Sequence, residues 1–175
     1  MTQRVLIVGI DPGRKGGVVA INERSELVFA ERMPWLNSRP PKLDLEELDS
    51  WIVLRAEGRH IHLALERTAP VSKGANATRS LAEQRGALLA WAERERYAVE
   101  LIGPQAWSKE MLEGLGYKGH EQKKRAAIGR VRELWPDLRM PTKADQEAFS
   151  DAALIAEYGR RRWMGRTLVA REGAA

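Results

Sequence analysis

Two acidic residues stand at the ends of apolar segments, where a carboxylate is costly to place. Asp11 directly follows the apolar run 5–10, and Glu66 ends the alternating run 60–66. Side chains alternate along a strand, so Asp11 points the same way as Ile7, toward a buried row. Burying a lone carboxylate costs several kcal/mol unless a cation meets it. The sequence therefore predicts a positively charged partner at these strand ends.

Two further acids lie on the last predicted helix, which we place at about 145–162. Glu147 and Asp151 are four residues apart, so they share one face of that helix. The residues beside them are small or apolar, which indicates that this face packs on the protein. Asp145 lies on another side and is predicted to be the N-cap.

Taken singly, each acid has an ordinary explanation. Asp11 could cap the turn that follows it, Glu66 could pair with an arginine, and the two helix acids could face solvent. Taken together, they form an oxygen-only cluster, which favours a hard cation such as Mg²⁺ or Mn²⁺. The chain has no cysteine, which excludes disulfides and thiolate metal sites. Its three histidines, His60, His62 and His120, lack the spacing of a zinc site.

Length and composition are those of one folded domain. The 175 residues are predicted to form a single domain over 1–175, with a flexible tail at about 167–175. No apolar run approaches the ~18 residues of a membrane span, and the first residues lack the pattern of a signal peptide, so we expect a cytoplasmic protein. The net charge of +5 favours an anionic partner such as nucleic acid.

The hydropathy pattern predicts an α/β fold. We expect a mixed five-stranded sheet, in which a three-stranded antiparallel meander is joined by parallel strands and flanked by helices. The predicted strands are 5–10, 18–21, 27–32, 60–66 and 98–102. The predicted helices are 44–57, 77–94, 107–115, 121–135 and 145–162.

These segments, in this order, resemble the RuvC-type Holliday junction resolvases of the RNase H-like superfamily, and most closely the short bacteriophage versions. The resemblance spans roughly residues 5–162. It is carried by Gly9-Ile10-Asp11-Pro12-Gly13, Leu65-Glu66-Arg67, Gly103-Pro104 with Trp107 and Lys109, and the run from Asp151 to Arg161.

The resemblance implies an activity. It implies a homodimer that binds a four-way DNA junction and nicks two strands symmetrically, as in DNA recombination and repair, leaving a 5′ phosphate and a 3′ hydroxyl. It also implies two Mg²⁺ ions per active site, for which Mn²⁺ substitutes. An apolar face of the helix that begins at Ala77 is expected at the dimer interface, because symmetric nicking needs two active sites.

The resemblance also implies four metal-holding catalytic acids. Asp11, Glu66 and Asp151 match three of them. The fourth family position is Ala148 here, which is a departure. Glu147 presents a carboxylate one residue earlier on the same face, and we prefer it to Asp145 as the fourth acid.

Basic side chains near these acids are candidates for contacts with DNA phosphates, which raise affinity without reading sequence. They are Arg14, Lys15, Lys73, Lys118, Lys123, Lys124 and Arg125. The loop 67–76 lacks the aromatic residue that bacterial relatives carry after the acid matching Glu66. The way in which bacterial relatives open the junction centre is therefore not implied for this chain.

Three other functions compete with this interpretation. An actin-like ATPase or sugar kinase shares the opening hairpin, but it needs a second phosphate loop and a duplicated domain. Another RNase H-like nuclease, acting on RNA or on other branched DNA, is closer; the helix acids and the chain length favour the resolvase. A non-catalytic DNA-binding module would not explain acids that face the protein interior.

Overall fold

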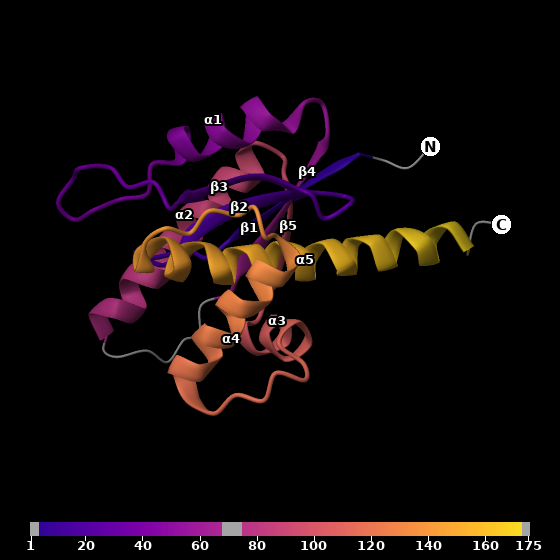
Figure 1. Ribbon diagram of the computed structural model, residues 1–175. Helices are drawn as coiled ribbons and strands as arrows, with labels where there is room; N and C mark the ends of the chain where they lie inside the picture. The colour runs from indigo at the N-terminus through magenta and orange to yellow at the C-terminus, as the bar shows by residue number, and fades with distance from the viewer. Residues whose placement is uncertain (1–3, 68–74, 173–175) are drawn as a thin grey trace.

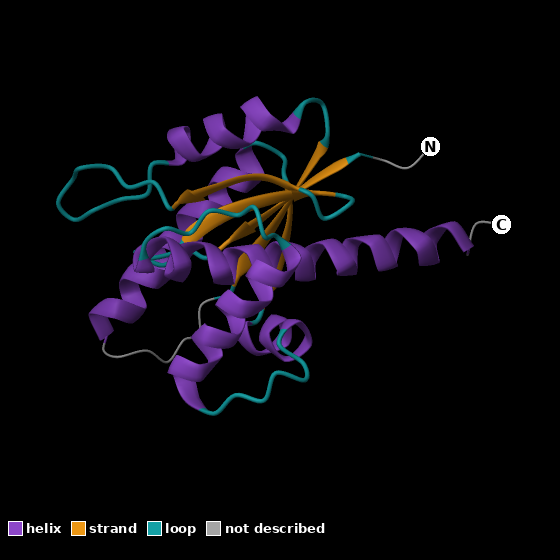
Figure 2. Ribbon diagram, in the orientation of Figure 1, coloured by secondary structure: helices purple, strands orange, loops and turns teal. Residues whose placement is uncertain are grey.

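The computed structural model describes residues 4–67 and 75–172, with side chains from 79 to 166 in the second part. Its centre is a five-stranded sheet with helices on both faces (Figure 1, Figure 2). The strands are β1 Val5–Ile10, β2 Gly17–Asn22, β3 Leu27–Arg32, β4 His60–Glu66 and β5 Ala98–Ile102. The helices are α1 Leu45–Ala56, α2 Ala75–Arg94, α3 Pro104–Met111, α4 Gly119–Leu134 and α5 Lys143–Glu172.

The sheet has the strand order β3-β2-β1-β4-β5 and the mixed character that the sequence predicts. The pairs β1–β2 and β2–β3 are antiparallel, whereas β1–β4 and β4–β5 are parallel. In the parallel β1–β4 pair, Ile10 is the partner of Leu65. The next residue of each strand is an acid, so Asp11 and Glu66 emerge side by side at one edge of the sheet.

Each face of the sheet is covered by its own helices. The alternating side chains Leu6, Val8 and Ile10 of β1 pack under α1 and α2, through core residues such as Leu48 and Trp91. The intervening residues of β1 face α5, with α3 and α4 packed against that helix (Figure 1). The face that carries Asp11 is therefore the face that α5 covers.

Two glycines let α5 lie directly on the sheet. A Cβ atom at Gly9 would collide with the backbone of Ala152, and one at Gly17 with the carbonyl group of Ala148. Ala148 and Ala152 are one helical turn apart, so these two strand glycines set both the position and the direction of α5. Asp151, next to Ala152, is thereby brought to the end of β1.

The helix boundaries differ from the predicted ones chiefly in α5. The helix begins at Lys143 and ends at Glu172, so it is longer at both ends than the predicted 145–162. The prediction of Asp145 as N-cap is wrong, because Asp145 lies inside the first turn and its backbone N–H donates to Thr142 Oγ1 at 3.1 Å. None of the helices in residues 4–67 and 75–172 has the length and apolar character needed to cross a membrane.

Candidate active site

Three of the predicted acids converge where α5 meets the ends of β1 and β4. Asp11 follows β1, Glu66 ends β4 and Asp151 lies on α5. Their charges act on one another: Asp151 raises the pKa of Asp11, and both Asp11 and Asp151 raise the pKa of Glu66. The parallel β1–β4 pair and the close contact of α5 with β1 therefore gather three residues that are far apart in the sequence.

Asp11 sits in an environment that disfavours its charge. Burial is the largest cause that raises its pKa to about 6, and the charge of Asp151 adds to it. The backbone N–H of Gly13 donates to Asp11 Oδ1 at 3.2 Å, and this bond acts in the opposite direction. The turn thus holds the carboxylate in place without compensating fully for its burial, so an additional positive charge would be stabilising here.

Glu66 is held by a tryptophan. Burial, followed by the charge of Asp11, raises its pKa to about 7. The indole Nε1 of Trp107 donates a hydrogen bond of 2.8 Å to Glu66 Oε1, which lowers the pKa. Trp107 is on α3 and is fully buried, so its ring cannot swing away without opening the core. The bond therefore fixes one oxygen of the carboxylate.

Two lysines of α4 face the three acids. Lys123 lowers the pKa of Glu66 and Asp151, and Lys124 lowers the pKa of Asp11 and Asp151. For Asp151, burial still outweighs both lysines, so its pKa is raised. Lys123 Nζ also lies 4.7 Å from the ring centroid of Trp107, on the ring face. The most basic segment of the sequence thus contributes its two central lysines to the acid cluster.

Glu147 has a different set of neighbours. Its carboxylate lies 3.6 Å from Lys15 Nζ, 3.8 Å from Lys124 Nζ and 4.0 Å from Lys143 Nζ, and its side chain is 16% exposed. Lys124 therefore acts on Glu147 as well as on Asp11 and Asp151. The predicted fourth acid is on the expected face of α5, but in this structure its charge is balanced by lysines.

Asp145 is committed to the start of α5. It accepts hydrogen bonds from the backbone N–H and the hydroxyl of Thr142, in a reciprocal pattern like that of a capping box. Arg32 Nη2 also donates to it at 2.6 Å. The hydrogen bonds from Thr142 and Arg32 lower the pKa of Asp145, with the Thr142 bond as the largest cause, and they outweigh the effect of burial, which raises it. The hydrogen bonds of this carboxylate thus join the start of α5 to Arg32 at the end of β3.

The donor set fits a hard divalent cation, although the side chains do not form a closed site. In the part of the chain that the structure describes, no three acidic or histidine side chains have the mutual spacing of a metal centre. The converging groups are nevertheless all carboxylates, and the burial and repulsion that raise their pKa are what a cation would relieve. Asp11, Glu66 and Asp151 are the residues that would hold it.

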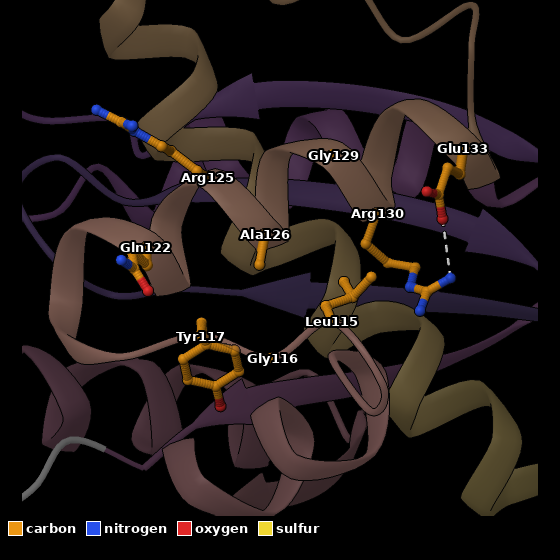
Figure 3. A pocket seen from close by; sticks show the side chains of 9 residues that line it. All are labelled: Leu115, Gly116, Tyr117, Gln122, Arg125, Ala126, Gly129, Arg130 and Glu133. Atoms are coloured by element: carbon orange, nitrogen blue, oxygen red, sulfur yellow. Dashed lines mark hydrogen bonds and ion pairs between the residues drawn. The ribbon is translucent and has the colours of Figure 1, made fainter.

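The other predicted DNA-binding residues are spread around this site. Arg14 and Lys15 lie in the β1–β2 turn, exposed beside Asp11, and Lys118 is exposed at the start of α4. Arg125 lines a hollow of about 270 Å³ between α4 and the preceding loop; its guanidinium extends away from Tyr117 and Leu115 (Figure 3). Lys73 and most of the loop 67–76 lie outside the described residues.

Sequence reasoning missed two residues near the acids. Trp107 was only part of the family resemblance, with no role, and Lys143 was not singled out. Pro104 opens a helix that places Trp107 at a buried position, but nothing local shows that its N–H meets an acid 41 residues earlier. For Lys143 the available signal was its i, i+4 spacing to Glu147.

Comparisons with known proteins support the fold. No sequence family matches the chain, and no curated protein matches it. Among solved structures, T. thermophilus RuvC in complex with a Holliday junction substrate has a TM-score of 0.58 at 16% identity, covering 93% of this chain and 96% of that one. A second Thermus thermophilus RuvC structure has a TM-score of 0.53 at 18% identity, with the same coverage of both chains. The chain therefore has the RuvC-type, RNase H-like fold.

Proposed function

We propose that this protein is a metal-dependent endonuclease that resolves four-way DNA junctions by paired, symmetric nicks. The observation that carries the proposal is the convergence of Asp11, Glu66 and Asp151 where α5 meets the ends of β1 and β4. The fold is shared with RuvC, and one RuvC structure is a complex with a Holliday junction substrate. Acids that raise each other's pKa at the edge of such a sheet are costly for stability, which favours a role in chemistry.

In this proposal the three acids are catalytic residues that hold two Mg²⁺ or Mn²⁺ ions. The chemistry that such ions supply is activation of a water molecule and stabilisation of the oxygen that leaves the phosphorus, so that the products carry a 5′ phosphate and a 3′ hydroxyl. The chain itself supplies ionised carboxylates in fixed positions. Trp107 keeps Glu66 oriented, and the Gly13 N–H keeps Asp11 oriented.

Lys123 and Lys124 are positioned to receive the scissile phosphate. Both are half-buried on α4 and act on the acids electrostatically. An incoming phosphate is anionic, so these ammonium groups would attract it, whereas the carboxylates would repel it. They would then hold the phosphate against the repulsion of Asp11 and Asp151.

The same proposal keeps Glu147 as the fourth acid. It lies one turn before Asp151 on α5, and its side chain is mostly buried. To complete the site, Glu147 has to exchange its lysine partners for a metal ion. Lys15 and Lys143 are highly exposed, so releasing them costs little, since exposed ion pairs contribute about 0–1 kcal/mol.

Phosphates further from the cut would be met by the remaining basic residues. These proposed contacts are Arg14, Lys15, Lys73, Lys118 and Arg125. Paired nicks on two strands need two active sites, so the proposed functional unit is a homodimer.

The test is cleavage of synthetic DNA in Mg²⁺. A four-way junction, a flap and a linear duplex of the same strand sequences are compared, with Asp11→Asn and Glu66→Gln as the inactive variants. We expect symmetric nicking of the junction by the wild type, none by either variant, and junction binding by all three proteins. Full activity in either variant overturns the site. Cleavage of the flap or of the linear duplex in preference to the junction overturns the proposed substrate and leaves the site intact.

A further inference from the structure

Two cavities beside the candidate active site share one residue, Arg14. The first, here the basic cavity, has a volume of about 330 Å³ and lies between the β1–β2 turn and the start of α5. The second, here the apolar cavity, has a volume of about 520 Å³ and lies between the loop 33–44 and α2. Arg14 lines both, so the two hollows adjoin at the turn that follows Asp11.

The basic cavity is suited to an anion. Its lining includes four cationic side chains, Arg14, Lys15, Arg32 and Lys143, and one carboxylate, Glu147. Lys15 and Lys143 both lie within 4.0 Å of Glu147 and have exposed fractions of 85% and 88%. Glu147, and Asp145, which accepts a hydrogen bond from Arg32 at 2.6 Å, do not balance the four cations, so the cavity keeps a net positive charge. A phosphate group fits this charge and these donors.

The apolar cavity is suited to a flat ring. Its walls include Trp35, Pro40, Pro41 and Leu43, and the guanidinium carbon of Arg14 lies 5.9 Å from the Trp35 ring centroid. The volume falls within the ~300–1,000 Å³ of small-ligand sites. An aromatic residue at the end of a basic track is the arrangement on which nucleobases stack.

Two polar atoms of the lining residues have no hydrogen-bond partner in the described part of the chain. They are the indole Nε1 of Trp35, a donor, and the amide Oε1 of Gln84 on α2, an acceptor. Each atom is buried, so a base would reach it only after a rotation of that side chain. A donor and an acceptor without partners match the edge of a base, which carries both.

We propose that the two cavities together bind one unpaired nucleotide of a DNA strand, with its phosphate in the basic cavity and its base on Trp35. The choice of DNA rests on the proposed function, whereas the nucleotide chemistry rests on the two cavities. The base must be unpaired because a base within a duplex has both faces covered by its neighbours. A simple anion would leave the apolar cavity empty, and an apolar peptide would place no negative charge in the basic cavity.

The experiment measures binding to single strands without metal, so that no cleavage occurs. The probe is a fluorescein-labelled thymidine oligonucleotide of about ten nucleotides, compared with an abasic oligomer of the same length and the same number of phosphates. For the full chain, we expect binding to the base-bearing strand to be on the order of tenfold tighter. Equal affinity for both strands would overturn the proposal, because phosphate contacts alone would then explain binding.

Variants separate the two cavities. Trp35→Ala and Ala87→Phe, which fills the apolar cavity from the exposed face of α2, should abolish the advantage of the base-bearing strand, whereas Trp35→Phe should keep most of it. Lys143→Gln should weaken binding to both strands by the same factor. Arg94→Gln removes a cation at the far end of α2 and should change neither affinity. An unchanged base advantage in a folded Ala87→Phe variant would refute the base site even if Trp35→Ala fails to fold.

Two further outcomes are distinguishable. Sedimentation of the chain alone shows whether a second copy occupies the apolar cavity; self-association that Ala87→Phe abolishes and the oligonucleotide does not displace would overturn the proposal. Junction cleavage is measured separately. A chain that discriminates base from abasic strands but cleaves no junction contradicts the proposed function alone, and a junction-cleaving chain without that discrimination contradicts this inference alone.

Discussion

Trp107 Nε1 donates a hydrogen bond of 2.8 Å to Oε1 of Glu66 and so ties α3 to the end of β4. The bond favours the ionised carboxylate, whose pKa burial and the Asp11 charge raise to about 7. The same indole ring is covered by Lys123 at 4.7 Å. One buried tryptophan therefore positions a proposed catalytic acid on its edge and a proposed phosphate-binding lysine on its face.

Replacing Trp107 by phenylalanine should shift the pH dependence of cleavage. The variant keeps most of the buried ring but loses the donor, so the pKa of Glu66 rises and less of the carboxylate is ionised at pH 7. We expect the rate at neutral pH to fall on the order of tenfold, with partial recovery at higher pH, because a hydrogen bond to a charged group contributes about 1.5–3 kcal/mol. Single-turnover cleavage as a function of pH measures this.

Trp135→Phe is the matched control. Trp135 lies in the same hydrophobic core, and its Nε1 donates to the backbone oxygen of Ser25 at 2.7 Å, away from the acids. Both variants should lose stability, but only Trp107→Phe should shift the pH profile. Identical profiles for the two variants would mean that Trp107 has a purely structural role.

The metal-free protein should become less stable as the pH rises from about 4 to about 7. The carboxyl groups of Asp11 and Glu66 have a higher pKa in the folded chain than in the unfolded chain, so the folded chain binds more protons over this range. The free energy of unfolding then decreases with pH and remains low above the folded-state values. Thermal unfolding between pH 5 and pH 8 in a chelating buffer measures the decrease.

Asp11→Asn and added Mg²⁺ should each reverse this loss at pH 8. The substitution removes a buried charge that repels Asp151, and the cation neutralises it, so both should raise the melting temperature. Asp11→Asn should also reduce the stabilisation by Mg²⁺. If the variant is less stable than the wild type at pH 8, the carboxylate is not under the strain inferred here.

Glu147→Gln should lower cleavage nearly as far as Asp151→Asn, with partial recovery in Mn²⁺, which binds such ligands more tightly than Mg²⁺. Asp145→Asn should have little effect on cleavage, because Asp145 is engaged by Thr142 and Arg32 at the start of α5. Single-turnover rates of the three variants decide between the two acids. If the Glu147→Gln protein is active, Glu147 serves only as an ion-pair partner of its lysines, and the site has three catalytic acids.

Gly9→Ala should destabilise the fold and the site together. The added methyl group meets the backbone of Ala152, so α5 has to move away from β1 and carry Asp151 with it. We expect a loss of about 1–3 kcal/mol in the free energy of unfolding, the usual cost of overpacking, and a loss of cleavage. Gly165→Ala, in an open part of the same helix, should be neutral or slightly stabilising. Denaturant unfolding of both variants tests this.

The protein should sediment as a homodimer at micromolar concentration, since paired nicks need two sites. An apolar face of α2, which begins at Ala75 rather than at the predicted Ala77, remains the predicted interface. A charged substitution at Ala82, which is exposed on this helix, should produce monomers that nick only one strand. A wild-type monomer that binds the junction and cuts both strands at once would contradict the dimer.

The sequence by itself determined the strands, the mixed character of the sheet and which acids stand at the ends of apolar strands. Alternation of apolar residues marked β4, and the faces of its side chains are as predicted, with Leu63 and Leu65 packed toward α1 and α2 and Ala64 toward α5. Once β1 and β4 are parallel neighbours, the acids that follow them must emerge together. Local periodicity is sufficient to place an acid at the end of each strand, because it depends only on the order of the residues. The pairing of β1 with β4 and the position of Asp151 beside them come from the tertiary structure.

Only the tertiary structure decided which charges balance which acids. Glu147 and Asp151 lie one turn apart on α5, yet only Glu147 is surrounded by Lys15, Lys124 and Lys143. Two of these lysines come from other elements, and the Trp107–Glu66 bond likewise joins separate elements. Such partners are fixed by how closely α5 packs on the glycines of the sheet. Packing depends on atoms brought together from the whole chain, so no local pattern in the sequence carries that information.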